Sequence, residues 1–274
     1  MTSSQQPKKE NWCNYSDLKS IKVFEYPDQA SKIIWAINSN NIIQLSSQII
    51  ELITTNKITI QMALRLIDVF SQIRDKEIKL FSELYQKISN AFSYINKPDN
   101  EKLATLLHYQ GFKFENFKPK IKEEEILNLY STDSPLYYIA WDKVDDLKCK
   151  FPNLDINERI DSKFNSELCF NYLKNLGAQY TDYSEKYAVQ GGNQNIFMQM
   201  IEEGKSFDNM INKALNYRHY EIVEYLQSNF GQTPDSIAEN MHFGNYDVAS
   251  YLLSNGEDIN KIYDIFLFIF IIVL

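Results

Sequence analysis

The sequence AVQGGNQNIFMQMIEEG, residues 188–204, returns twice in altered form at a spacing of 26 residues. Its counterparts are ALNYRHYEIVEYLQSNF at residues 214–230 and NMHFGNYDVASYLLSNG at residues 240–256. Each block is too short to bury its own apolar face. A repeat of this length therefore indicates helical units that stack on one another.

Four columns of the alignment carry the match. They are Gly192, Arg218 and Gly244; then Asn193, His219 and Asn245; then Ile196, Ile222 and Val248; and lastly Met200, Leu226 and Leu252. The last two columns are four residues apart, so their side chains share one helix face. The blocks end at Gly204, Phe230 and Gly256, and glycine is the residue that a left-handed helix C-terminus prefers.

A second helix is predicted upstream of each block. Asp182 with Glu185 forms a capping-box pattern, and Asp208 follows 26 residues after Asp182. Thr233-Pro234 offers an N-cap followed by the proline that the first helical position favours. Each repeat therefore reads as helix, tight turn, helix, with Gly192 at the turn and Asn193 able to bind the turn backbone.

These residues resemble the ankyrin repeats. GNYDVASYLLSNGEDIN, Gly244 to Asn260, is similar to the second half of such a repeat, and SPLYYIA, Ser134 to Ala140, to its start. LDIN from Leu154 matches the EDIN from Glu257, and LCFNYLKNLGA from Leu168 resembles another second helix. The resemblance covers residues 134–260.

The departures from ankyrin repeats concern the loops. A period of 26 residues is shorter than the ankyrin unit of about 33 residues, so the hairpin fingers must be reduced to short loops. Arg218 replaces the turn glycine, and two of the three blocks lack the threonine-proline start. The combination of a helical N-terminal region with short, degenerate repeats is similar to the large ankyrin families expanded in some parasitic protists.

The resemblance implies partner binding through a concave surface, lined by the ends of the first helices and by the fingers. The exposed column at those helix ends falls on Trp141, Gln190, Asn216 and His242. We expect these four residues to face a protein partner. The competing interpretation is that they are ordinary solvent-exposed side chains.

The N-terminal half predicts a separate all-α bundle. Apolar residues recur at spacings of three and four through residues 28–111, in five segments separated by short polar loops. Residues 1–27 are expected to be a flexible N-terminus and residues 112–133 a charged linker with one short helix. The repeats are expected to fill residues 134–260, and an apolar tail residues 261–274.

The tail contains IFLFIFIIVL, residues 265–274, which is half or less of the roughly 20 apolar residues that cross a bilayer. Terminal repeats of a stack normally carry a polar cap instead. Three explanations stay open: a truncated or frame-shifted reading, an element folded back on the last repeat, and a membrane-associating tail.

Composition and motifs argue against several classes of ligand and site. The net charge of −8 disfavours nucleic acid as a partner. The three cysteines and three histidines form no metal-binding or disulfide pattern, and Cys169 lies in an apolar helical column that predicts burial. Gly191-Gly192 lacks the lysine and spaced glycines of a phosphate-binding loop. The N-terminus shows no secretory signal, which favours a cytoplasmic location.

The sequence thus predicts a non-enzymatic scaffold that binds an unidentified protein, with no cofactor, metal, nucleic acid or small-molecule substrate. Two alternatives remain. One is a membrane-associated adaptor that uses residues 265–274, and the other is an enzyme whose activity resides in the N-terminal bundle. A deep polar pocket with convergent titratable groups in the bundle would favour the enzyme.

Overall fold

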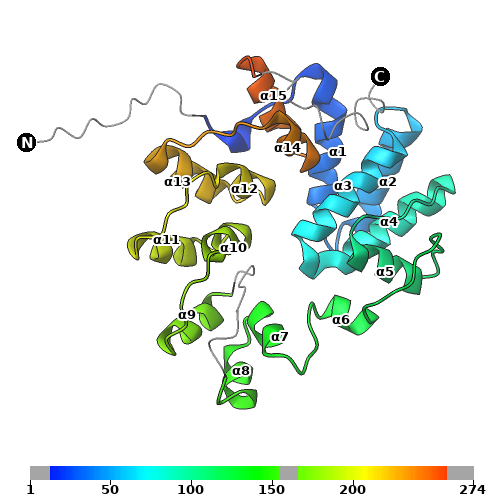
Figure 1. Ribbon diagram of the computed structural model, residues 1–274. Helices are drawn as coiled ribbons and strands as arrows, with labels where there is room; N and C mark the ends of the chain where they lie inside the picture. The colour runs from blue at the N-terminus through cyan, green and yellow to red at the C-terminus, as the bar shows by residue number, and fades with distance from the viewer. Residues whose placement is uncertain (1–12, 155–165, 258–274) are drawn as a thin grey trace, which may run out of the picture. The chain divides into compact units, whose positions relative to one another are not determined.

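The computed structural model describes residues 13–154 and 166–257, and every regular element within these ranges is helical (Figure 1). The predicted all-α class is therefore confirmed.

The α-helices are α1 (Glu25–Trp35), α2 (Ile42–Thr54), α3 (Ile60–Ile73), α4 (Ile78–Phe92), α5 (Glu101–Tyr109), α6 (Glu123–Leu127), α7 (Pro135–Ala140), α8 (Val144–Lys150), α9 (Glu167–Asn175), α10 (Ser184–Gly191), α11 (Gln194–Glu202), α12 (Ile211–Asn216), α13 (Tyr220–Phe230), α14 (Ile237–His242) and α15 (Tyr246–Ser254). Short 3-10 helices are η2 (Tyr15–Asp17), η3 (Lys22–Phe24) and η4 (Asp75–Glu77).

The chain divides into two compact units, each built from two stretches of sequence. Unit 1 consists of residues 1–19 and 138–236, and unit 2 of residues 20–137 and 237–274. This division differs from the predicted boundaries at 28–111 and 134–260. The difference arises because the last helical pair, α14 and α15, groups with the N-terminal helices and not with the preceding repeats.

Helices α1 to α5 form the bundle of unit 2, as the five apolar segments predicted. Each helix packs on a neighbour in the chain, and α1 also contacts α3 while α2 contacts α4. The predicted apolar positions form its core: Ile34, Ile49, Ile67, Phe81 and Ile88 are all fully buried. Amphipathic helices joined by short loops have this outcome because each buries one apolar stripe against the next.

Polar contacts join α15 and its turn to α1 in unit 2. The Ser31 hydroxyl donates to the Gly244 carbonyl at 2.6 Å, and Lys32 forms an ion pair with Asp247 at 3.1 Å. A Cβ on Gly244 would lie 2.5 Å from the Ser31 hydroxyl. These contacts leave room only for glycine at this turn.

Two segments predicted to be loosely attached are ordered parts of their units. Within the predicted flexible N-terminus, Tyr15 and Phe24 are 2% and 5% exposed. Within the predicted linker, α6 packs on α5, and Phe112 and Ile126 are buried. Their charged neighbours gave these segments a loop-like composition, but the interspersed apolar side chains bury enough surface to hold them in place.

Unit 1 contains a stack of helical hairpins (Figure 1). The second helices pack in series, with α8 against α9, α9 against α11 and α11 against α13, and the first helix α10 packs against α12. Helix η2 lies against α13.

The turn between the two helices of each pair contains a residue in the left-handed region. The φ angles are 71° at Gly192, 56° at Arg218 and 73° at Gly244, which confirms the alignment at a spacing of 26 residues. Asp142, between α7 and α8, has φ 53° and holds the same place. A left-handed residue reverses the chain within two or three residues, so the helices can lie back to back.

Second helices end in the same conformation, with one shift from the prediction. Gly204 and Gly256 have positive φ as expected, but in the middle repeat the left-handed residue is Gly231 and not Phe230. Helix α13 has 11 residues, whereas α11 and α15 have 9 each, and its left-handed residue lies one position later than the register predicts. Glycine accepts this conformation at no steric cost.

The predicted N-caps of the first helices are wrong. Helix α12 begins at Ile211, after Asp208, and α10 begins at Ser184 with Tyr183 at its N-cap. The Gln232 side chain, from the loop after α13, accepts the N–H groups of Met210 and Ile211 at 3.0 and 3.1 Å. A side chain from the next repeat therefore replaces the local cap.

The predictions for the C-terminal tail concern residues 261–274, which lie outside the described residues. Most of the LDIN motif from Leu154 also lies outside them.

Gly192→Ala tests the geometry of the turn. A Cβ at Gly192 would lie 2.2 Å from the His219 ring, whereas a Cβ at Gly204, which also has positive φ, would meet nothing within 4 Å. We expect Gly204→Ala to cost about 1–2 kcal/mol for the left-handed backbone, and Gly192→Ala about 1 kcal/mol more because His219 must leave its hydrogen bond. Urea unfolding measures both values.

The double variant Gly192→Ala/His219→Ala is the control. In the His219→Ala background, Gly192→Ala should cost no more than Gly204→Ala costs in the wild type, because the ring is gone. If its cost stays about 1 kcal/mol higher, the steric explanation is wrong.

Candidate functional site

The four predicted partner-facing residues do not form one exposed column. Trp141 is 36% exposed, whereas Asn216 is 1% exposed and has no surface to offer a partner. Gln190 and His242 are half-buried, and His242 belongs to unit 2 while the other three belong to unit 1. Asn216 was predicted to be exposed because the 26-residue register gives its helix position but not what covers it.

Trp141 is also one residue out of register. Asp142 matches Gly192 in its left-handed conformation, so the residue equivalent to Gln190 is Ala140, which is fully buried. The predicted positions therefore do not form a continuous exposed column.

One edge of the stack, which we call the turn edge, comprises the helix turns at residues 141–143, 166–169, 190–195 and 216–219. Side chains link consecutive turns along it. The Asp142 carboxylate accepts the Cys169 N–H at 2.8 Å and the Leu168 N–H at 3.2 Å, at the first turn of α9. Glu167 in turn accepts the side-chain amides of Asn193 and Asn195, each at 3.0 Å.

His219 completes this series. Its Nε2 lies 3.0 Å from the Gln190 carbonyl oxygen, and its ring occupies the space where Gly192 has no side chain. His219 occupies the alignment column of Asn193 and also binds turn backbone, although the backbone is that of the preceding repeat. Burial lowers the pKa of His219, so the ring is neutral at pH 7.

The Gly191-Gly192 pair has its backbone committed to the turn. The Gly192 N–H donates to the Ala188 carbonyl at 3.1 Å, and the Asn193 side chain caps α11 by accepting the Ile196 N–H at 3.0 Å. A phosphate would have to displace these hydrogen bonds. The geometry agrees with the rejection of a phosphate-binding loop.

The opposite edge, which we call the loop edge, comprises residues 176–183, 203–210 and 231–236, together with the helix ends before them. Lys174 at the end of α9 pairs with Glu203 at 2.9 Å. The Tyr180 ring lies between two ammonium groups, with its centroid 4.0 Å from Lys174 Nζ and 4.8 Å from Lys205 Nζ. Lys205 also pairs with Glu185 at 3.6 Å.

Charge in this cluster is balanced by its own members. The hydrogen bond from Lys174 lowers the pKa of Glu203 to about 2, so the carboxylate is ionised. Burial raises the pKa of Tyr180, so its phenol stays protonated. Lys174 pairs with Glu203, and Lys205 pairs with Glu185. These ion pairs connect adjacent repeats.

Gln232 fixes the next loop in the same way. Its amide donates to the Phe207 carbonyl at 2.8 Å in addition to accepting the two N–H groups at the start of α12. Beneath it, the rings of Phe207 and Phe197 pack at 4.5 Å. The loop edge is therefore held by side chains rather than by hairpin fingers.

Three large apolar or aromatic side chains remain exposed along this edge. Leu176 is 44% exposed, Tyr183 is 52% exposed and Phe230 is 47% exposed. The ion pair of Lys174 with Glu203 connects the ends of α9 and α11, and the hydrogen bond from Gln232 to Phe207 connects the loops after α13 and α11. The ends of these three helices therefore lie on the same edge of unit 1. Sequence reasoning expected the ends of the first helices and the fingers to line the partner surface, but it named residues only at the helix ends and so missed this set.

The bundle of unit 2 contains an open groove between α1 and α2, with a volume of about 740 Å³. Lys32 in this groove pairs with Asp28 at 2.8 Å and Asp247 at 3.1 Å. Burial alone would lower the pKa of Lys32, but the two carboxylates raise it. A lysine that acts as a general base or as an amine nucleophile needs the opposite shift.

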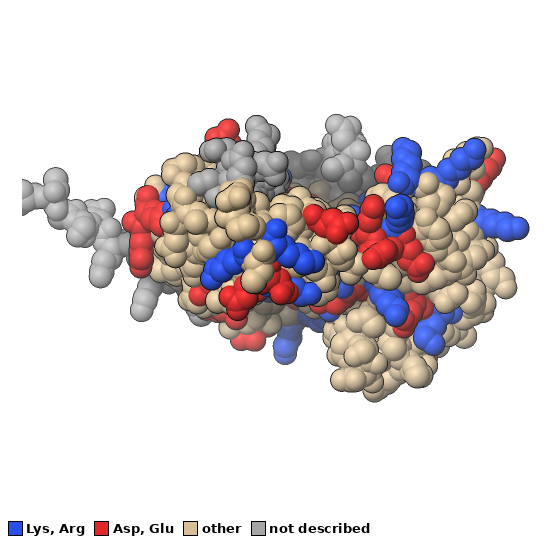
Figure 2. Space-filling model, turned by 90° about the horizontal axis from the view of Figure 1, so that it is seen from below, with Lys and Arg blue, Asp and Glu red and all other residues tan. Residues whose placement is uncertain are grey.

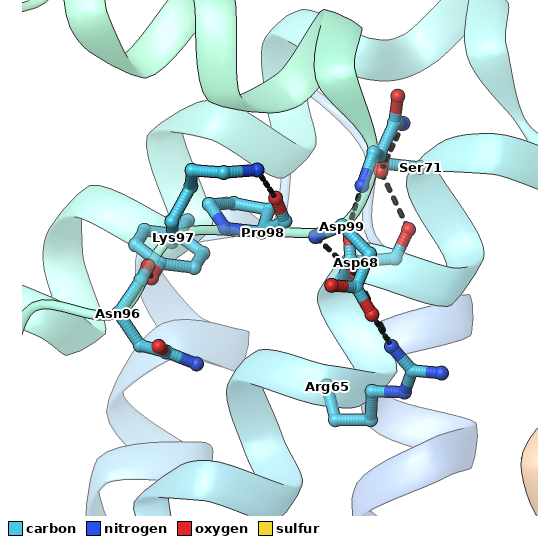
Figure 3. Close-up of polar contacts among 9 residues, drawn as sticks. Arg65, Asp68, Ser71, Asn96, Lys97, Pro98 and Asp99 are labelled. Atoms are coloured by element: carbon cyan, nitrogen blue, oxygen red, sulfur yellow. Dashed lines mark hydrogen bonds and ion pairs between the residues drawn. The ribbon is translucent and has the colours of Figure 1, made fainter. Parts of the chain in front are cut away.

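A second polar cluster joins α3 to the start of α5 (Figure 3). Asp68 is 3% exposed and accepts the backbone N–H groups of Asp99 at 3.1 Å and Asn100 at 2.9 Å. Arg65 contacts both Asp68 and Asp99, and the Asn100 amide donates to Ser71 at 2.8 Å. Burial raises the pKa of Asp68 although these donors act against it. The cluster anchors the beginning of α5.

The described cysteines and histidines do not assemble into a reactive site. Cys169 is fully buried, as predicted, and burial with the nearby Asp142 charge raises the pKa of its thiol to about 12. Residues 13–154 and 166–257 contain no group of three or more His, Cys, Asp or Glu side chains placed to hold a metal ion. Within the same ranges, no helix has the length and apolar character needed to cross a bilayer.

Charge is mixed on the face that Figure 2 shows. Where residues are described, basic and acidic side chains lie among one another, separated by uncharged surface. A surface of mixed sign offers no extended field to a polyanion.

The burial of His219 predicts a pH dependence of stability. A histidine whose folded pKa lies below its unfolded value of 6.5 takes up protons more readily when the chain unfolds. The free energy of unfolding should therefore fall as the pH drops below 6.5 and through the lowered folded pKa. His219→Asn, which installs the residue found at the other two turns, should reduce this fall.

Thermal unfolding between pH 7.5 and pH 5 measures the effect. Burial also lowers the pKa of His242, so protonation of His242 in the unfolded chain contributes to the loss of stability at low pH. The His219→Asn variant should therefore retain part of the dependence of stability on pH. Identical slopes for wild type and His219→Asn would contradict the assignment.

Asp68→Ala should cost about 2–3 kcal/mol in urea unfolding, because it leaves two backbone N–H groups at the start of α5 without their acceptor. Asp99→Ala is the matched control. Its side chain is 75% exposed and contacts Arg65 at the surface, so its loss should cost less than about 1 kcal/mol. Equal costs would show that Asp68 is not the anchor of α5.

Comparisons with models of known protein families, with curated proteins and with solved structures find no match to this chain. Its function must therefore be argued from the arrangement of its own residues.

Proposed function

We propose that the chain is a non-enzymatic scaffold for protein–protein interaction, and that its partner binds the loop edge of unit 1. The observation that carries the proposal is the exposure of Leu176, Tyr183 and Phe230 along one edge of a stack whose backbone is fixed by side-chain ties. Aromatic and large apolar residues are the side chains that contribute most to binding when they are buried at an interface.

The ankyrin-like character of the stack is part of this proposal. It is supported by the helix–turn–helix pairs, by left-handed residues at the turns and by second helices that end in left-handed glycines. In ankyrin stacks the fingers contribute to partner binding, and the loop edge occupies the place of the fingers. Trp141, 36% exposed at the first turn, is a further position that a partner can contact.

Rigidity of the edge supports the proposed role. The Tyr180 cluster and Gln232 hold neighbouring loops before any partner arrives. Binding then loses less conformational entropy than it would with free loops. Because Lys174, Lys205, Glu185 and Glu203 neutralise one another, the edge presents aromatic and apolar contacts without a strong field of either sign.

We propose the cytoplasm as the compartment, since the three cysteines, all among the described residues, are not joined in disulfides. The membrane-associated alternative depends on residues 265–274, which lie outside the described residues. The enzyme alternative depends on the bundle groove, where Lys32 is tied to two carboxylates.

Substitution of the exposed pair Leu176→Ala/Tyr183→Ala should remove partner binding without unfolding the chain, because both side chains project into solvent. The measurement is quantitative mass spectrometry of proteins captured by the tagged full-length chain from cells that express it. A matched control is Ile95→Ala/Tyr109→Ala, in which an aliphatic and an aromatic residue of similar exposure, 59% and 48%, are removed from unit 2.

Specific partners should be depleted about tenfold or more by the first variant and retained by the control. Equal recovery with both variants would refute the loop edge as the binding surface. Circular dichroism of each variant checks that the helices are intact.

A further inference from the structure

Helix α13 carries a polar side chain at a position where the equivalent helices have aliphatic ones. Gln227 aligns with Ile201 and Leu253 at the 26-residue spacing. Its side chain is nevertheless 8% exposed. A buried carboxamide needs hydrogen-bond partners, so this position must contact something that the other repeats lack.

The partner of Gln227 is the backbone of Cys13. With the amide oriented to satisfy both of its atoms, Gln227 donates to the Cys13 carbonyl at 3.0 Å and accepts the Cys13 N–H at 3.1 Å. Every residue except proline offers this pair of groups. Gln227 therefore binds main chain regardless of the side chain that the residue carries.

The residues that follow Cys13 provide contacts that depend on the identity of their side chains. Asn14 caps a short turn, its Oδ1 accepting the Ser16 N–H at 3.1 Å and its amide donating to Asp17 at 2.6 Å. This turn directs Tyr15 inward, where it is 2% exposed, while helix η2 lies on α13. Ser16 and Asp17 remain exposed.

We propose that this face of α13 is a docking site for a linear peptide segment, and that residues 13–17 of the chain occupy it as an intramolecular ligand. The ligand is a short segment with three features. One residue offers its backbone N–H and carbonyl groups to Gln227, an asparagine follows and caps a turn, and a tyrosine comes two residues after the first residue. A segment of another protein with this chemistry binds when it displaces residues 13–17. The site is distinct from the loop edge, and the proposal does not depend on it.

The main-chain clamp explains why the occupant can exchange. The contacts described for residues 13–17 are the main-chain pair of Cys13, which binds the Gln227 carboxamide, and the buried Tyr15 side chain. A separate peptide can supply a main-chain pair and a tyrosine as well. A tethered segment competes at an effective concentration of the order of millimolar. A free peptide should therefore act in that range on the wild-type chain, and at lower concentration once the tethered segment is weakened.

The first experiment uses the wild-type full-length chain and an acetylated peptide of residues 13–19 with Cys13→Ser. Alkylation of Cys13 is followed by mass spectrometry, with the exposed Cys149 as internal reference. Millimolar peptide should raise the Cys13 rate severalfold and leave the Cys149 rate unchanged. The same peptide with Tyr15→Ala should have no effect. An unchanged Cys13 rate up to several times this concentration overturns the proposal.

The second experiment measures fluorescence anisotropy of the labelled peptide with full-length variants. Tyr15→Ala should bind about tenfold more tightly than wild type, because its own segment competes less. Tyr15→Ala/Gln227→Leu, which installs the aliphatic character of the equivalent positions, should lose this binding. Equal binding by both variants overturns the role of Gln227. If Tyr15→Ala does not fold, the alkylation rates of the wild-type chain decide the question.

Discussion

A left-handed residue at the turn of each helical pair is the constraint on which the repeats depend. The two helices can lie back to back only if the chain reverses within a few residues, and one residue with positive φ achieves this. Gly192 has a second role in packing, because its missing side chain leaves the space that the His219 ring of the next repeat fills. Arg218 adopts the same conformation without glycine, so that the middle repeat keeps its geometry at some energetic cost.

Side chains replace the long loops that a period of 26 residues cannot accommodate. Along the turn edge, Asp142 accepts a backbone N–H group at the start of α9, and Glu167 accepts the side-chain amide of Asn193 at the next turn. Along the loop edge, Gln232 binds the backbone of the preceding loop at three points. Such contacts satisfy backbone groups that would otherwise face each other unpaired across the stack. They also fix the exposed aromatic side chains on a rigid support, which suits a binding surface.

The charged groups of the bundle are used inside the fold. Asp68 is buried because it accepts the N–H groups that open α5, and Lys32 bridges two carboxylates from α1 and α15. A carboxylate or ammonium group committed in this way has its partners already supplied. The bundle thus shows ionic contacts that position its helices.

The sequence by itself determined the features that depend on local pattern. Helical periodicity predicted the all-α class and a bundle of five helices within residues 28–111, and the 26-residue spacing located the turns at Gly192, Arg218 and Gly244. It also predicted the burial of Cys169. Only the tertiary structure decided which helices join across the chain. The grouping of α15 with α1 and the place of Tyr15 on α13 rest on contacts between residues far apart in sequence. The same holds for the burial of Asn216 and for Gln232 at the start of α12. A periodic pattern records which face of a helix is apolar, but not which segment covers that face, because many segments of similar composition could do so.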